Sequence, residues 1–112
     1  MAKRYSNDTH LTEQAYYILL SLLIPLHGYG IMQAVKRISN GKVVVGAGTV
    51  YGALDAMVQS GWVQLVAEEG RRKVYLITDE GKQILRRNLE RVSQMSQAGE
   101  MMLPMMESDP IA

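Results

Sequence analysis

Three consecutive basic residues, Arg71-Arg72-Lys73, form the densest cluster of positive charge outside the ends of this 112-residue chain. They follow Gly70, and a glycine next to charged residues between two apolar runs is typical of a hairpin tip. Guanidinium and ammonium groups at such a tip are well placed to neutralise phosphates. The alternative interpretation is a solvated turn whose charge is balanced by Glu68 and Glu69. Both interpretations are open on these residues alone.

Two hydroxyl side chains, Thr49 and Tyr51, fall in the first turn of a helix predicted over residues 49–60. Hydroxyls at the start of a helix that enters a DNA groove suit phosphate oxygens or base edges. Thr49 is also a good N-cap, and Tyr51 is equally suited to a core position. Lys36, in the preceding predicted helix, would extend the basic surface, unless it is an ordinary solubilising charge.

Other kinds of chemistry find little support in the sequence. The absence of cysteine excludes disulfides, thiolate metal sites and cysteine nucleophiles. His10 and His27 are the only histidines, and structural roles are favoured for both. The run Val43–Gly48 resembles a dinucleotide-binding turn. However, the third glycine is misplaced at Gly52, and the predicted helix is followed by a hairpin instead of a second parallel strand, so we exclude a dinucleotide site. We therefore expect no enzyme activity, no metal and no cofactor.

The composition indicates one small soluble domain. The chain has 47% apolar and 21% charged residues and a formal charge of +1, so affinity for a polyanion must come from a local arrangement of charge. The apolar stretch Tyr16–Leu26 contains Pro25 and is shorter than the roughly 18 residues that cross a bilayer. Because no signal peptide is visible either, we expect a cytoplasmic protein.

The hydrophobic pattern predicts four helices and three strands. The predicted helices cover residues 13–24, 29–38, 49–60 and 79–98, and the predicted strands cover residues 42–45, 62–66 and 73–77. Two helices separated by a turn, with a hairpin after the second, are the winged form of the helix-turn-helix. The expected fold class is α+β and mostly helical.

The last predicted helix begins after Thr78, a good N-cap, with Asp79 in its first turn. Gly99 is expected to end it, although its apolar stripe would allow it to continue. Pro104 makes residues 99–112 a flexible or weakly helical tail in this interpretation.

Several short motifs, in this order and at this spacing, resemble the PadR family of bacterial transcriptional regulators over about Leu11 to Met95. The motifs are Leu11-Thr12-Glu13, Tyr17-Ile18-Leu19, Leu26-His27-Gly28-Tyr29-Gly30-Ile31, Gly48-Thr49-Val50-Tyr51-Gly52-Ala53-Leu54, Gly61-Trp62-Val63 and Gly70-Arg71-Arg72-Lys73-Val74-Tyr75-Leu76-Ile77-Thr78-Asp79-Glu80-Gly81. The resemblance is to the short version of the family, which has no separate effector domain and dimerises through its last helix packed against the first.

The resemblance implies a winged helix-turn-helix DNA-binding domain over residues 1–78, a dimerisation helix over 79–98 and a tail over 99–112. Within the first, it implies a recognition helix over about 49–60 and a wing over about 62–77, preceded by an arm over 1–10. Lys3 and Arg4 in the arm would extend the basic surface, unless they are ordinary solubilising charges. The implied function is a repressor that binds a palindromic operator in double-stranded DNA as a homodimer. The DNA-binding residues expected from these arguments are Lys36, Thr49, Tyr51, Arg71, Arg72 and Lys73.

One departure from the family concerns the recognition helix. Many members carry basic residues at the positions of Gly52, Asp55 and Ala56, whereas here the helix has no lysine or arginine. Bidentate arginine contacts to bases are therefore unavailable from it. This keeps open an alternative function, a winged-helix dimer that acts as a protein-protein interaction module.

A second predicted surface is apolar and rich in methionine. Eight methionines, five of them from Met95 onward, indicate an adaptable surface. In the first interpretation, these residues belong to the core and the dimer interface. In the second, they form a pocket for a small apolar or aromatic effector. The residues expected at the effector site or dimer interface are Tyr16, Leu20, Leu89, Val92 and Met95.

Overall fold

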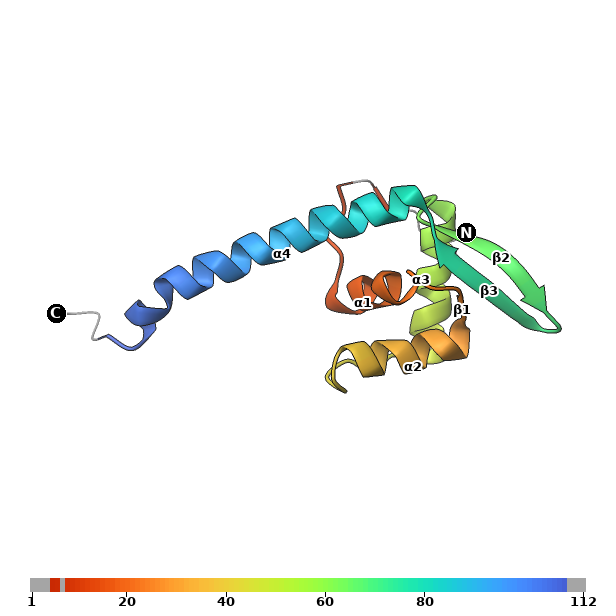
Figure 1. The fold of residues 1–112 in the computed structure, drawn as a ribbon, viewed down its shortest axis with the longest axis horizontal. Coiled ribbons are helices and arrows are strands. Elements are labelled where there is room, and N and C mark those ends of the chain that lie inside the picture. The colour runs from red at the N-terminus through yellow and green to blue at the C-terminus, as the bar shows by residue number, and fades with distance from the viewer. Residues whose placement is uncertain (1–4, 7, 109–112) are drawn as a thin grey trace.

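The computed structural model describes residues 5, 6 and 8–108, so Lys3, Arg4 and the end of the predicted tail lie outside the described residues. Figure 1 shows a small helical core from which a long helix projects on one side and a two-stranded hairpin on the other. The elements are α1 (Glu13–Ser21), β1 (Leu26–His27), α2 (Gly28–Ile38), α3 (Ala47–Gln59), β2 (Val63–Glu69), β3 (Arg72–Ile77) and α4 (Asp79–Met106). The fold is mostly helical, as the sequence predicts, and its three strands form one antiparallel sheet.

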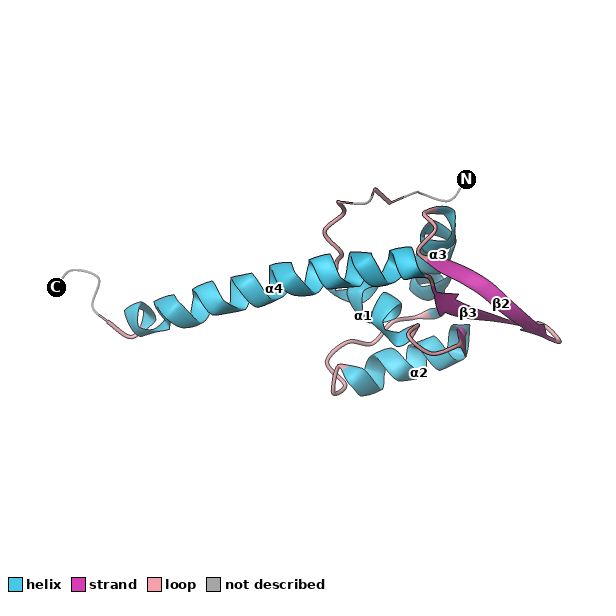
Figure 2. Ribbon diagram, turned by 45° about the horizontal axis from the view of Figure 1, so that its top comes forward, coloured by secondary structure: helices cyan, strands magenta, loops and turns pink. Residues whose placement is uncertain are grey.

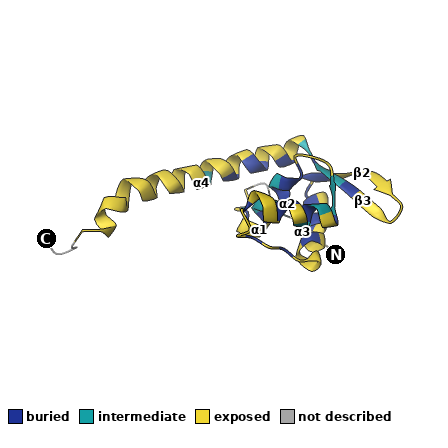
Figure 3. Ribbon diagram, turned by 60° about the horizontal axis from the view of Figure 1, so that its bottom comes forward, coloured by how far each residue is buried: buried dark blue, intermediate teal, exposed yellow. Residues whose placement is uncertain are grey.

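The core lies between α1, α2, α3 and the first turns of α4, where buried residues gather in Figure 3. Ile18 of α1, Ile31 of α2 and Leu54 of α3 are almost completely shielded from solvent. Trp62, between α3 and β2, is fully buried and stacks on Tyr5 with ring centroids 4.9 Å apart. The tryptophan is thus a packing anchor between the core and the segment before α1.

The sheet has the order β1-β3-β2, and Figure 2 shows its two longer strands beside the helices. The sequence did not indicate β1, which is only two residues long. Leu26 pairs with Tyr75 and His27 with Val74, so the segment just before α2 is hydrogen-bonded to the base of the hairpin. This pairing is what places the start of α2 beside β3.

The helix cap predicted at Thr78 is confirmed, and Thr12 caps α1 in the same way. The side-chain oxygen of Thr12 accepts the N–H of Ala15, and that of Thr78 accepts the N–H of Gly81. The first helix nevertheless ends at Ser21 rather than at Ile24, which corrects the prediction. The residue before a proline avoids the helical region, and Pro25 leads the chain directly into β1.

The segment between α2 and α3 also differs from the prediction. Residues 42–45 form no strand, because their polar backbone groups bond locally: the N–H of Val43 donates to the Ser39 hydroxyl at 2.9 Å. The next helix begins at Ala47 with Gly46 as its N-cap and no side-chain cap. Thr49 is therefore a residue of the first turn and not the N-cap.

The helix α4 continues through Gly99 to Met106, so the prediction that Gly99 ends it was wrong. One glycine inside a helix costs only about 1 kcal/mol, and Pro104 lies in the last turn. After Asn88 every residue of α4 except the half-buried Arg91 is exposed, as Figure 3 shows. Most of the helix therefore lies clear of the domain's own core.

Candidate nucleic-acid interface

The wing is the hairpin formed by β2 and β3. Its strands reach Glu69 and Arg72, so it is longer than predicted and turns through only two residues. Gly70 in this turn has a φ of 63°, a left-handed value that glycine adopts without strain. The cluster Arg71-Arg72-Lys73 is exposed at the end of this projecting hairpin. The predicted charged tip is thus present, with Glu68 and Glu69 on the opposite strand.

A cavity of about 370 Å³ lies where the wing meets α2 and α3, and it is called the junction cavity below. Its wall is formed by His27, Gly28, Tyr29, Tyr51, Asp55, Arg71, Arg72, Lys73 and Tyr75. Four of the six residues predicted to contact DNA are in this set. Side chains from the helix-turn-helix and from the wing therefore line one continuous surface.

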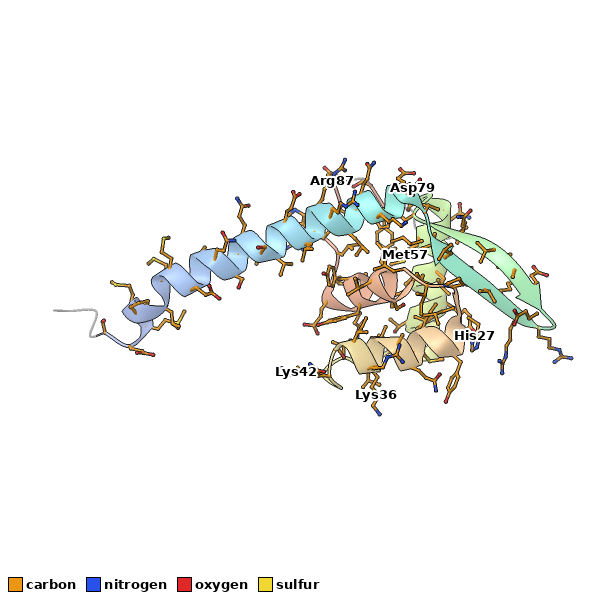
Figure 4. The ribbon with its side chains drawn as sticks, in the orientation of Figure 1. His27, Lys36, Lys42, Met57, Asp79 and Arg87 are labelled. Atoms are coloured by element: carbon orange, nitrogen blue, oxygen red, sulfur yellow. The ribbon has the colours of Figure 1, made fainter. Side chains whose placement is uncertain are left out.

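His27 is positioned in this cavity by its role as the N-cap of α2. Its Nδ1 accepts the N–H of Gly30 at 3.2 Å. His27 pairs with Val74 on β3. Arg72 is two residues before Val74, so its side chain and the His27 ring lie on the same side of the sheet. A guanidinium nitrogen of Arg72 lies 3.5 Å from His27 Nε2. Figure 4 shows His27 at the end of α2 nearest the sheet.

Tyr51 is half exposed and packs its hydroxyl end against Gly28. It therefore does not belong to the core, the other role that the sequence allowed. Tyr75 lines the same cavity from β3. Burial, and after it the nearby Asp55, Tyr51 and Glu68, raises the pKa of Tyr75, so its hydroxyl stays protonated and able to donate.

The outer face of α3 carries few long side chains and no lysine or arginine. Gly48, Thr49 and Gly52 are exposed, and no atom lies within 4 Å of where a β-carbon on either glycine would stand. Asp55, also exposed, is the charged residue of this helix. A helix with so few long side chains allows its backbone to approach a partner surface closely.

Two predicted residues lie outside the junction cavity. Thr49 is exposed in the first turn of α3. Lys36 lines a separate groove of about 660 Å³ along α2, together with Arg37. Figure 4 shows Lys36 further along α2 than His27, with its side chain directed away from the core. Tyr29 lines both hollows, so the two are neighbours on the surface.

A second candidate surface lies between α1 and α4. Tyr16, Leu20 and Leu89 line a small pocket of about 230 Å³ there, which Lys82 and Arg86 border with their charged side chains. Val92 and Met95 lie further along α4, outside this pocket, and are about half or more exposed. The structure thus brings together three of the five residues predicted for an effector site or dimer interface.

Sequence reasoning missed five residues of the junction cavity: His27, Gly28, Tyr29, Asp55 and Tyr75. Tyr29 and Asp55 gave no signal that separates them from ordinary surface residues. His27 gave none either, because the predicted helix begins at Tyr29 and the residue at its capping position would be Gly28. Its contact with the wing depends on β1, which two residues are too few to reveal.

Within the described part of the chain, no helix combines the length and hydropathy that crossing a bilayer requires. No group of three or more histidine and acidic side chains there is arranged to hold a metal ion.

Comparison with known proteins gives a consistent family match. The model of the family described as "Transcriptional regulator PadR-like family" matches residues 18–87. The transcriptional regulator YqjI of Escherichia coli is 28% identical over 71 residues, which are 63% of this chain and 34% of YqjI. The chain spans about a quarter to a third of the length of the curated relatives it matches.

Solved structures show the same fold. RosR of H. salinarum is 26% identical with a TM-score of 0.64, and the match covers 76% of each chain. PadR of Bacillus subtilis, solved in complex with operator DNA, is 27% identical with a TM-score of 0.59, over 69% of this chain and 46% of that one. The shared architecture is that of winged-helix regulators.

Proposed function

The chain belongs to the transcriptional regulator PadR-like family, and on this premise we propose that it is a repressor that binds a palindromic operator as a homodimer. The family consists of transcriptional regulators rather than enzymes. Its relative of known structure in Bacillus subtilis was solved on operator DNA. A dimer held across an operator blocks access to a promoter, which is why we propose repression.

The junction cavity is the observation that carries this proposal. It joins α3, the helix that would enter the major groove, to three cationic side chains of the wing. Because the wing projects beyond the core, its tip can follow the phosphate backbone while α3 faces the groove. The DNA-contacting residues that we propose are Lys36, Thr49, Tyr51, Arg71, Arg72 and Lys73.

Affinity in this proposal comes mainly from the DNA backbone. With no lysine or arginine in α3, strong bidentate contacts to guanine are not available from that helix. The close approach that Gly48 and Gly52 permit favours recognition of groove shape instead. We expect specificity to come from shape and a few polar contacts.

The exposed apolar part of α4 supports the dimer. Leu89, Val92 and Met102 are spaced along the helix and are about half exposed, although a soluble helix usually buries such a stripe. A second copy of the chain would cover them and Tyr16 of α1. Two-fold symmetry would then place two recognition helices about 34 Å apart, one turn of DNA.

The pocket between α1 and α4 is where we propose that a small apolar or aromatic effector binds. Its lining by Tyr16, Leu20 and Leu89 suits such a ligand. Since the same helices form the proposed dimer interface, a bound effector would change the spacing of the recognition helices. The coupling must then be reciprocal: DNA would alter effector affinity by the same factor.

The test is binding of the chain to DNA from its own upstream region and to a scrambled duplex of equal length and composition. The proposal expects selective binding to the upstream duplex with two chains per site. Equal and weak binding to both duplexes would point to another operator. The absence of binding to any duplex at low salt would reject the proposal in favour of a protein-protein interaction module.

A further inference from the structure

The hydrogen bond that caps α2 fixes the chemistry of the other nitrogen of His27. Nδ1 accepts the N–H of Gly30, so it carries a lone pair and no proton. A neutral imidazole has one N–H, and it must therefore be on Nε2. The nitrogen that faces the wing is a hydrogen-bond donor.

The contact between His27 and Arg72 consequently joins two donors. The guanidinium nitrogen of Arg72 lies 3.5 Å from Nε2, and a guanidinium has no acceptor. The two groups cannot bond to each other in this tautomer. What would satisfy both N–H groups together is a shared acceptor, and an anionic oxygen would also compensate the arginine charge.

Tyr51 brings a third donor to the same cavity. Its hydroxyl end lies beside Gly28, the residue that follows His27, and its side chain lines the cavity together with Arg72. His27 is the N-cap of α2, Tyr51 lies on α3 and Arg72 lies on β3. Asp55 also lines the cavity, so the positive charges of Arg71, Arg72 and Lys73 must offset its repulsion of an anion.

We propose that His27, Arg72 and Tyr51 together bind one backbone phosphate of DNA, so that a single phosphate joins the helix-turn-helix to the wing. This inference rests on the proposed function and specifies a contact within it. It also assigns His27 two tasks: its Nδ1 caps α2, and its Nε2–H donates to the phosphate. The bound phosphate would fix the angle of the wing relative to α3, because it touches both.

The experiment separates the two tasks of His27 with the variant His27→Ser. Serine is a good N-cap and keeps the bond to Gly30, but it is too short to replace the Nε2–H donor. We expect this variant to fold and dimerise normally and to bind DNA about tenfold more weakly per half-site, the usual effect of losing a hydrogen bond to a charged group. Its salt dependence should not change, since a neutral donor releases no counterion.

Arg72→Ala is the matched partner, and the two variants are combined in a double-mutant cycle. If both side chains hold one phosphate, their effects are not additive. Arg37→Ala removes a positive charge from the last turn of the same helix, outside the junction cavity, and is the control. Its effect should add to that of His27→Ser.

A set of duplexes, each with one phosphate replaced by a neutral methylphosphonate, locates the contact. The wild-type chain should lose affinity when one particular phosphate in each half-site is neutralised. The variants His27→Ser and Arg72→Ala should lose little further affinity at that position, because they already lack the contact. Equal sensitivity of wild type and both variants at every position, or additive effects in the cycle, would overturn the proposal.

Failure of the proposed function can be told apart from failure of this site. If no duplex binds, the His27 ring resonances are followed by NMR during titration with inorganic phosphate. A saturable shift that Arg72→Ala abolishes would keep the phosphate site while rejecting DNA as its source. No shift would reject the site as well.

Discussion

The hydroxyl oxygen of Tyr51 on α3 lies 2.5 Å from the position that a β-carbon on Gly28 of α2 would occupy. The absence of a side chain at Gly28 therefore allows the tyrosine to lie across the start of α2. This packing directs Tyr51 into the junction cavity beside the wing. A residue with no functional group thus helps to position one that has a hydroxyl.

Replacing Gly28 with alanine should displace Tyr51 with little effect on folding. The atom that must move is the far end of a side chain, and alanine is favoured over glycine within a helix. We expect the temperature of unfolding to be unchanged or slightly raised while DNA affinity falls several-fold. Tyr51→Phe, which removes only the hydroxyl, should lower DNA affinity to a similar extent. Wild-type affinity in Gly28→Ala would show that the position of Tyr51 does not matter for binding.

Gly81, in the first turn of α4, has no room for a side chain at all. A β-carbon there would overlap the carbonyl oxygen of Trp62 and meet the side chain of Ile77 at 2.7 Å. Since backbone cannot move aside as a side chain can, Gly81→Ala should destabilise the fold by about 1–3 kcal/mol.

The matched control for Gly81 is Gly99, in the exposed part of the same helix, where nothing lies near a β-carbon. Gly99→Ala should raise stability by up to about 1 kcal/mol. Denaturant unfolding of both variants checks the pair. If Gly81→Ala gained stability as Gly99→Ala does, the close packing of α4 on Trp62 would be refuted.

The proposed dimer predicts that a charge on the exposed stripe of α4 separates the subunits. Leu89→Glu places a carboxylate where the partner would pack, and sedimentation should then show a monomer at concentrations where the wild type is dimeric. Operator affinity should fall with it, because one chain binds only a half-site. Glu90→Gln alters an exposed neighbour and should leave the dimer intact. A dimeric Leu89→Glu would place the interface elsewhere.

Asn88 ties α4 to the segment before α1. Its buried side chain accepts the N–H of Leu11 at 2.9 Å and donates to the carbonyl of Ile84 at 3.0 Å. Asn88→Leu should cost about 1–3 kcal/mol, because it leaves the N–H of Leu11 buried without an acceptor. Asn88→Asp, which keeps the accepting oxygen, should preserve slow amide exchange at Leu11 while Asn88→Leu loses it. Equal exchange rates in both variants would contradict this role.

Features set by neighbouring residues were predictable from the sequence. Thr12 and Thr78 cap their helices because a threonine oxygen reaches the backbone three residues ahead. The wing was predictable because Gly70 stands between two β-prone runs. In each case the deciding contact lies within a few residues of the signal.

Features set by distant contacts were not predictable. The pairing of Leu26 with Tyr75 joins segments far apart in the chain, and two residues carry no periodic pattern. Thr49 looked like a cap because it is a favoured capping residue, yet the helix begins earlier, at Ala47, without a side-chain cap. The place of His27 in the candidate site depends on β1, so it was not predictable either.

The wing is proposed to bind DNA through its positive charge, and the salt dependence of binding measures that charge contribution. The affinity of the wild-type chain and of Arg71→Ala/Arg72→Ala for one duplex is measured across a range of salt concentrations. Each lost phosphate contact lowers the slope of log affinity against log salt by about 0.9. We predict weaker binding to all DNA and a visibly flatter slope for the double variant. An unchanged slope would contradict the claim that these arginines neutralise phosphates.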